Sequence, residues 1–264
     1  MKFSQVLTSV ALAAAAFSAS AANLTIDGTS SPYQLLSSTA TIQFTDDVTN
    51  AESSVVGAFS VASISLGATG AATLDAGSYA TGEDFVHVIA PVSSVVVDTA
   101  TGSFVSVASI GGMSQTAPKS SAANGGTITI SNLTVDFATK QIFGDVSGSS
   151  LAGTTVSGNK AIFTFQDLVG PSTFTALAAG QTATFTNTLT HLTLTTAGVA
   201  DIKTALGLKG IGATTLNNLT DFGSIVSTIT VKNVTPAVPE PSTYAMLGVG
   251  LAMAGVVARR RRQA

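Results

Sequence analysis

The residues of this chain best suited to acid–base chemistry are His87 and two carboxylates shortly before it, Glu83 and Asp84. A histidine oriented by a carboxylate is what a hydrolase uses to activate a hydroxyl nucleophile. The alternation of residue types puts His87 on one strand face with Phe85 and Ile89, and the chain contains no G-x-S-x-G elbow. We therefore expect His87 to be a buried or half-buried structural residue. The alternative is a carboxylate–histidine pair, which is the only candidate site for a secreted hydrolase.

Metal and nucleotide sites are disfavoured by the remaining residues. His191 is the second histidine and cysteine is absent, which disfavours zinc and excludes disulfides. Asp46-Asp47 and Glu83-Asp84 carry oxygen ligands for calcium, but no D-x-D-x-D-G loop surrounds them. In the glycine-rich stretch 207–215 the lysine precedes the second glycine, unlike the lysine of a P-loop. We expect no catalytic residue besides the histidine candidate, no metal and no cofactor.

Threonine dominates the most regular stretch of the chain, residues 182–196. Alternate side chains of an extended strand share a face, and five threonines therefore share one: Thr182, Thr184, Thr186, Thr188 and Thr190. Phe185 and Leu189 fall on the opposite face and are predicted to enter the core. We expect the threonine face to be a solvated strand, because threonine is a good strand former. The alternative is a flat surface that binds a glycan or ice.

The same stretch changes its alternation after His191, because Leu192 and Leu194 fall on the former threonine face. A β-bulge or a bend near His191 would explain the change. Stacking on sugar rings is disfavoured, since tryptophan is absent and Tyr33 and Tyr79 are the only tyrosines of the body. Hydrogen-bonded recognition of a glycan by Asp, Asn and Thr side chains stays open.

The elements that must hold these residues are mainly strands. Short alternating stretches bounded by turn residues predict strands, and they occur at 39–48, 84–98, 124–138, 160–168 and 224–234. Pro91 interrupts the second stretch, which predicts one or two strands there. Helical spacing is confined to a short stretch at 199–208. The pattern predicts an all-β, sandwich-like domain of antiparallel strands.

Two stretches, 97–104 and 135–142, share the pattern V-D-x-A-T. We predict a hairpin at each, in which Asp98 or Asp136 opens the turn by bonding its own backbone. The fifth residue from that aspartate, Gly102 or Lys140, then takes the tight backbone geometry. The repeat has two interpretations, a duplicated β-unit or two similar turns.

The amino end has the features of a signal for export. Lys2 precedes a mostly apolar stretch at 6–17, and small residues follow that stretch. Ala21 and Ala22 mark the two expected cleavage positions. We therefore predict a signal peptide helix over residues 1–22.

The carboxyl end combines an apolar run with a basic cluster. The run at 244–258 carries no charge and directly precedes four arginines: Arg259, Arg260, Arg261 and Arg262. Its length is near the lower limit for a membrane span. We predict a single transmembrane helix that the arginines stop and orient, with their end on the cytoplasmic side and the body outside.

The last 27 residues resemble the PEP-CTERM sorting signal of exported bacterial proteins. The matching features are the box Pro239-Glu240-Pro241, the apolar run and the arginine cluster, in that order and at the extreme end. The resemblance implies a Gram-negative host that makes exopolysaccharide, and an exosortase-type membrane transpeptidase as partner. That enzyme would recognise the Pro-Glu-Pro box and remove the helix. The resemblance does not extend to the body.

The charge of the body limits its partners. Without the terminal signals the chain keeps six lysines and thirteen acidic residues, a net charge of −7. An acidic, arginine-free surface is a poor match to nucleic acid or to anionic polysaccharide. We expect no nucleic-acid partner.

Three segments follow from these observations: a signal peptide (1–22), a mainly β extracellular body (23–235) and a sorting signal (236–264). We expect a precursor held transiently in the inner membrane and a mature protein at the cell surface or outside the cell. The body would be a non-catalytic structural or interaction module of the cell surface or of the exopolysaccharide (biofilm) matrix, with extracellular polysaccharide as a candidate partner. The alternatives are a secreted hydrolase and a glycan- or ice-binding β-protein.

Overall fold

The computed structural model describes residues 22–30, 32–45, 54–76 and 85–235, together with Met246 and Val249. Its strands are β1 (Asn23–Asp27), β2 (Tyr33–Leu35), β3 (Thr39–Gln43), β4 (Ser65–Thr69), β5 (Thr73–Ala76), β6 (Val86–Asp98), β7 (Phe104–Ser109), β8 (Gly112–Ala117), β9 (Gly126–Asp136), β10 (Gln141–Ser150), β11 (Thr155–Thr164), β12 (Asp167–Val169), β13 (Thr182–Thr190), β14 (Thr193–Leu194) and β15 (Ser224–Asn233). Its helices are α1 (Val55–Val61), α2 (Thr196–Leu206) and α3 (Gly210–Asn218). All described strand pairs are antiparallel, which confirms the predicted fold class for the body.

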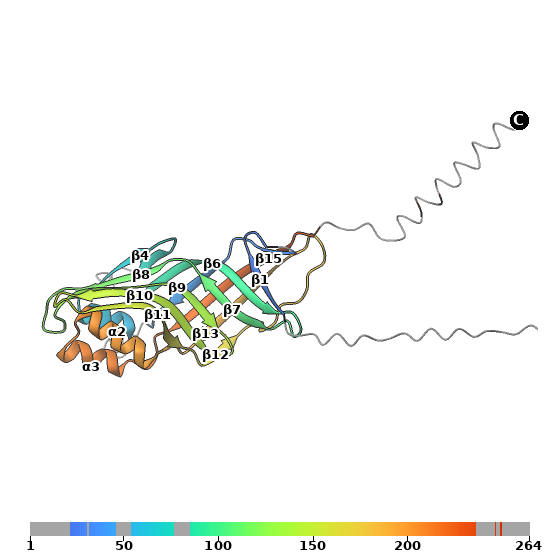
Figure 1. Cartoon of the computed structure of the whole chain (residues 1–264). Coiled ribbons are helices and arrows are strands. Elements are labelled where there is room, and N and C mark those ends of the chain that lie inside the picture. Colours follow the sequence, from blue (N-terminus) through green and yellow to red (C-terminus); the bar gives the residue numbers. More distant parts are fainter. Residues whose placement is uncertain are drawn as a thin grey trace, which may run out of the picture.

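The strands form two sheets that share strand β6 (Figure 1). Sheet A has the order β6-β7-β9-β10-β11-β14, with β1 beside β6 and the pair β8 and β4 beside β9. Sheet B has the order β12-β13-β15-β3-β6, with β5 beside β6 and β2 beside β15.

Strand β6 passes from one sheet to the other at Pro91. Its first half pairs with β3 and β5, and its second half pairs with β1 and β7. Pro91 is exposed and has no backbone N–H to donate, and the register against β7 shifts just beyond it, at Val92 and Ser94. The sequence predicts either one strand or two strands over residues 84–98. The structure has one continuous strand that changes sheets at the proline.

The core lies between the sheets and consists of two hydrophobic clusters. The larger cluster takes Ile128 and Ile162 from sheet A and Ile225 from sheet B. The smaller cluster contains residues such as Val95 of β6 and Ile229 of β15. A series of aromatic contacts with ring centroids 4.9–6.3 Å apart runs between the clusters through Tyr33, Phe174, Phe185, Phe104, Phe137 and Phe165.

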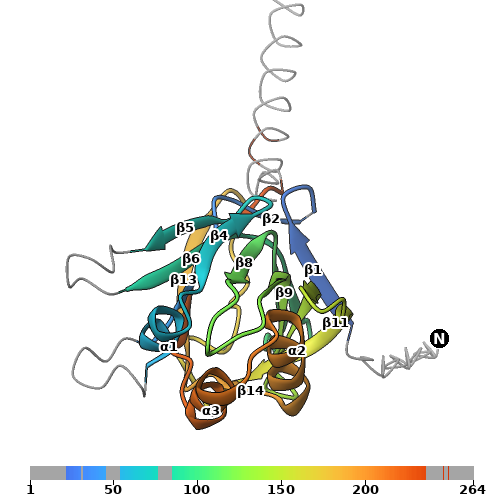
Figure 2. The same ribbon diagram turned by 90° about the vertical axis from the view of Figure 1, so that its left-hand side faces the viewer.

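Three helices gather at one end of the body, around the ends of β8 and β9 (Figure 2). Helix α2 confirms the helical spacing found at 199–208, whereas α1 and α3 are not predicted by the sequence. The Ser54 hydroxyl caps α1 by accepting a 2.9 Å bond from the Gly57 N–H, and Thr195 caps α2 through the Gly198 N–H at 3.0 Å. Helix α3 has no side-chain cap.

Glycines in sheet A let α2 pack directly on the strands. A Cβ atom at Gly148 would lie 2.5 Å from the Thr127 carbonyl oxygen and 2.9 Å from Cβ of Ala205 in α2. A Cβ at Gly126 of the neighbouring strand would collide with the Ala205 carbonyl oxygen. An ion pair between Lys160 of β11 and Asp201 of α2, with Nζ and Oδ2 2.8 Å apart, also stabilises the packing of α2 on sheet A.

The predicted bend near His191 is confirmed. His191 has a φ of 52°, in the left-handed region, directly after the last residue of β13. The chain leaves sheet B there and enters sheet A as β14, which pairs with β11. Leu192 is fully buried between them. The alternation changes because the chain moves to the opposite sheet.

In the part of the chain that the structure describes, no helix combines the length and apolar character that a membrane crossing requires. The transmembrane helix expected at 244–258 lies outside the described residues, except for Met246 and Val249, which are helical. Residues 1–21 of the expected signal peptide, with Ala21, and the sorting residues Pro239, Glu240 and Pro241 also lie outside them, whereas Ala22 is the first described residue. So do the four arginines Arg259, Arg260, Arg261 and Arg262.

Candidate functional site: an apolar pocket at the helical end

An apolar pocket lies between the helices and the inner faces of both sheets. Its empty volume is about 860 Å³, counting the solvent at its mouth. The pocket is lined by Ile42, Phe44, Val55, Ala58, Phe59, Val61, Ala62, Ile64, Val88, Gly112, Met113, Gln115, Ile130, Leu133, Phe163, Ile202, Leu206, Leu208, Gly212, Thr215, Leu216, Leu219 and Phe222.

Aromatic side chains form much of the wall. Phe44 and Phe59 meet edge to face with ring centroids 5.6 Å apart, and Phe163 and Phe222 lie 5.9 Å apart at a tilt. Helix α1 supplies one side of the pocket and helix α3 supplies another. Val61, at the end of α1, is 43% exposed at the rim and so marks the mouth.

Two polar side chains line the pocket, Gln115 and Thr215. Gln115 projects inward from β8 and is 6% exposed. Thr215 lies on α3 and is half-buried. None of the lining residues that the structure describes is charged. The arrangement therefore suits an uncharged, mainly apolar molecule.

The apolar space continues between the sheets. A second cavity, with an empty volume of about 430 Å³, shares four lining residues with the first: Ile42, Val88, Gly112 and Leu133. It extends to Val107 and Val135 of sheet A and Ile225 of sheet B. The apolar lining thus continues from the helical end toward the middle of the sandwich.

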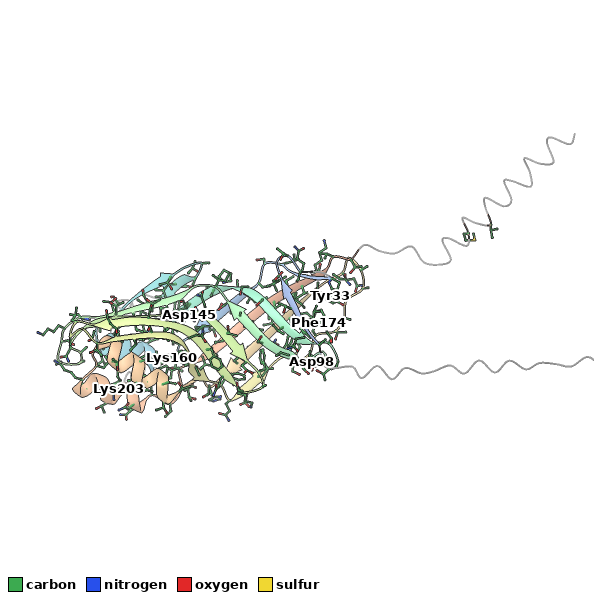
Figure 3. All side chains as sticks on the ribbon, viewed as in Figure 1. Tyr33, Asp98, Asp145, Lys160, Phe174 and Lys203 are labelled. Atoms are coloured by element: carbon green, nitrogen blue, oxygen red, sulfur yellow. The ribbon has the colours of Figure 1, made fainter. Side chains whose placement is uncertain are left out.

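The pocket lies at the opposite end of the body from the points where the described chain begins and ends. Phe222 lines the pocket, and β15 starts two residues later and runs ten residues to Asn233. At about 3.3 Å per residue this strand covers about 33 Å. Figures 1 and 3 show the separation: the helices and Lys203 lie at one end, and Tyr33 and Phe174 lie toward the other.

His87 lies away from the pocket, on the outer face of sheet B. It is half-buried, as predicted, and its ring centroid lies 5.0 Å from that of Phe85. Its cross-strand neighbours are Gln43 on β3 and Asp75 on β5. Among the described residues no hydrogen bond or ion pair reaches the imidazole. The carboxylates Glu83 and Asp84, proposed as its partners, lie outside the described residues, as do Asp46 and Asp47.

The predicted threonine row is part of a wider face. Thr182, Thr184 and Thr186 are exposed, and Thr188 and Thr190 are half-buried, while Leu189 enters the core. The row extends sideways across sheet B, since Thr184 lies opposite Thr230 and Thr186 opposite Thr228, which faces Thr39. The Thr184 and Thr230 hydroxyl oxygens are 3.0 Å apart and hydrogen-bonded. We call this surface the threonine face.

The outer face of sheet A carries Asp145 at the centre of a polar cluster. Its carboxylate accepts hydrogen bonds from the side-chain amides of Asn159 at 2.9 Å and Asn132 at 3.0 Å. These bonds, the Asn159 bond foremost, hold the pKa of Asp145 below its ordinary value of 3.8. Within the described residues no group of three or more His, Cys, Asp or Glu side chains could hold a metal ion.

Sequence reasoning does not identify the pocket. Its residues are ordinary core types from eight or more separate segments, and no spacing distinguishes them from the rest of the core. The sequence does contain one indication of the pocket. Gln115 alternates with Met113 and Ala117 along β8, so this polar residue lies on the strand face that points into the core. A polar side chain at a core position indicates a function or a buried partner.

A protein-family model described as the PEP-CTERM protein-sorting motif matches residues 237–262. This confirms the resemblance found in the sequence, and the chain carries that motif at its carboxyl end. The motif is typical of exported proteins that an exosortase sorts. No curated protein matches the chain.

Two crystal structures from Corynebacterium glutamicum are similar to this chain. The C-terminal domain of HtaA matches at 15% identity and a TM-score of 0.44, covering 75% of this chain and 99% of that domain. HtaB, which is described as a heme binding protein, matches at 16% identity and a TM-score of 0.40, covering 75% and 96%.

Proposed function

We propose that this protein is an exported, non-catalytic binding protein that holds an uncharged apolar molecule in the helical-end pocket. The observation that carries the proposal is the pocket itself. Aromatic and aliphatic walls line it, and the described lining residues include two uncharged polar side chains, as in apolar small-molecule sites. Burial of an apolar ligand there is favourable by roughly 25 cal/mol for each Å² of apolar surface removed from water.

The place of action that we propose is the cell surface or the extracellular space. The sorting motif supports passage through the membrane and recognition by an exosortase-type transpeptidase. We propose that this enzyme recognises Pro239, Glu240 and Pro241, removes the segment that ends in the four arginines, and releases the acidic body outward.

Substituting Glu240→Ala should then leave the tail on the protein, and the intact mass of the protein measured in each cell fraction would report this. A mass unchanged from that of the wild type would contradict this role of the box.

The binding proposal is tested by titrating the mature protein, purified from its host, with the neutral fluorophore N-phenyl-1-naphthylamine. We expect one saturable site. Ala58→Phe, which fills the pocket from α1, should weaken binding at least tenfold. Val61→Trp at the exposed rim is the second variant, since its bulk can be tolerated in solvent. Ala100→Phe, in the exposed β6–β7 turn, is the matched control.

Binding that survives both pocket variants would contradict the proposal, as would the absence of saturable binding to the wild-type protein. Thermal unfolding of each variant separates lost binding from lost folding.

A second candidate function is the docking of a neutral polysaccharide on the threonine face. The observation that favours it is the sideways extension of the threonine row, in which hydroxyl groups recur on three adjacent strands, β13, β15 and β3. Thr184→Tyr with Thr186→Tyr should abolish retardation in gels containing dextran. Ser147→Tyr with Ser157→Tyr is the matched control, because these exposed residues are cross-strand neighbours on the outer face of sheet A. Equal retardation of all variants would contradict this function and would show that the threonine face is only a solvated strand surface.

A further inference from the structure

Among the described lining residues of the pocket, Gln115 alone has a side chain that is both polar and almost fully buried. It is 6% exposed and projects from β8 into the pocket. Its main chain is held by pairing with Leu66 of β4 and Ile128 of β9. The strand position is thus fixed by backbone bonds, and the side-chain amide is free to serve another partner.

Among the described residues, no side-chain hydrogen bond is made by the Gln115 amide. Most of the other buried polar residues differ in this respect: the Ser54 hydroxyl caps α1, Ser38 bonds the Thr230 N–H at 2.9 Å, and Asp201 pairs with Lys160. The exception is Asn187 of β13, whose Oδ1 is also unpaired but which does not line the pocket. A buried amide without a partner is costly, because it has given up its bonds to water.

The charge of the pocket narrows the class of partner. No described lining residue carries a charge, so among these residues the carboxylate of a fatty acid would find no counter-ion in the apolar space. Burying an unpaired charge costs far more than burying a neutral polar group. A hydroxyl or carbonyl oxygen can accept a bond from the Gln115 Nε2–H at no such cost, and a hydroxyl can also donate to Oε1.

We propose that Gln115 is the specificity-determining residue of the pocket, and that the ligand is an uncharged, mainly aliphatic molecule with one hydroxyl or carbonyl group that bonds the Gln115 amide. This inference rests on the proposed binding function. The adjoining cavity is lined by Leu133 and Ile225, and it continues the apolar surface along which the aliphatic part would lie between the sheets.

The test uses three probes of similar length, 1-decanol, decanoate and undecane, each displacing N-phenyl-1-naphthylamine from the mature protein. We expect the wild-type protein to bind decanol about five- to tenfold more tightly than undecane, the gain of one net hydrogen bond. Decanoate should bind more weakly than decanol by more than tenfold.

The variant Gln115→Leu should lose the preference for decanol and bind it no more tightly than undecane, because the decanol hydroxyl then has no partner. Undecane should bind at least as tightly as to the wild-type protein. Gln115→Met is the second variant if the leucine substitution disturbs folding. Gln141→Leu is the matched control, because Gln141 is a half-buried residue of β10 that does not line the pocket. It should keep the wild-type preference for decanol.

Three other results of the probe measurements would contradict the inference, the ligand class or the binding function. Tight binding of all probes, with no preference for decanol that depends on Gln115, would overturn the inference and leave the binding function intact. A preference for decanoate would overturn the uncharged ligand class. Failure of every probe, including the fluorophore, to bind would overturn the binding function and the inference together.

Discussion

At the scale of single residues, two aspartates close equivalent hairpin turns. Asp98 Oδ1 accepts bonds from the N–H groups of Ala100 at 2.7 Å and Thr101 at 3.2 Å. In the β9–β10 turn Asp136 Oδ1 accepts the equivalent bonds at 2.9 and 3.2 Å. Gly102 and Lys140 have φ values of 72° and 53° at the fifth position. Both predicted hairpins are confirmed, since the turn depends on local bonds that the V-D-x-A-T pattern specifies.

Replacing either aspartate by alanine should lower the free energy of unfolding by about 1 kcal/mol, the net value of a hydrogen bond. Urea unfolding of Asp98→Ala and Asp136→Ala measures this loss. Asp167→Ala is the control, because the exposed Asp167 side chain makes no hydrogen bond with the described residues. Equal stability of all three variants would contradict the assigned turns.

Asp145 adds a pH-dependent contribution at the same scale. Its pKa is lowered in the folded protein, so its carboxylate stabilises the fold above the ordinary value of 3.8. That contribution is lost as the pH falls through the lowered pKa. Because the side chain is exposed, solvent keeps the effect small.

Removing the first donor should raise the pKa of Asp145. In Asn159→Ala the carboxylate keeps the Asn132 bond alone, and its titration, followed by carboxyl-carbon NMR, should move up toward 3.8. Asn217→Ala on α3 is a control that leaves the cluster intact. An unchanged Asp145 titration in Asn159→Ala would show that the amide does not stabilise the charged form.

At the scale of elements, the strands could be predicted and two of the helices could not. The strands at 224–234 and near 39–43 could be predicted because apolar and polar residues alternate along them. Helix α1 has the sequence VVGAFSV, whose β-branched residues indicate a strand. Helix α3 contains glycine and threonine and has no capping side chain. Both helices depend on tertiary packing, which local propensity does not contain.

The packing of α2 on sheet A depends on Gly148. In Gly148→Ala the added methyl group would meet Ala205 of the helix and the Thr127 carbonyl, so the helix must shift outward. We expect a loss of about 1–3 kcal/mol, typical of overpacking, in chemical unfolding. Gly28→Ala is the matched control, since a Cβ there meets nothing within 4 Å. Equal stability of both variants would contradict the close approach of α2.

At the scale of the whole molecule, the sequence predicts the sorting of the protein better than it predicts the pocket. The sorting motif is contiguous, so residues 237–262 reveal it directly. The pocket combines Phe44, Phe163 and Phe222 with helices that tertiary packing forms, and each of these phenylalanines looks like ordinary core. The one visible clue is Gln115, and its meaning depends on knowing which strand face is inward.

Ligand binding should stabilise the whole body, because the unfolded chain has no pocket. A ligand at 100 times its dissociation constant adds about 2.7 kcal/mol to the free energy of unfolding. We expect 1-decanol to raise the thermal midpoint of the wild-type protein and of Gln141→Leu, and to leave that of Ala58→Phe unchanged. Differential scanning calorimetry measures the shift. A similar rise in all three proteins would mean that decanol acts outside the pocket.

The most direct test of the central claim is the native mass of the mature protein purified from its host, before and after denaturation. We predict a denatured mass that begins at Ala22 or Asn23 and ends near the Pro-Glu-Pro box. The native mass should exceed it by one small uncharged molecule, which Ala58→Phe loses. A protein that retains Arg259 to Arg262, or whose native and denatured masses agree, would contradict an exported carrier of an apolar ligand.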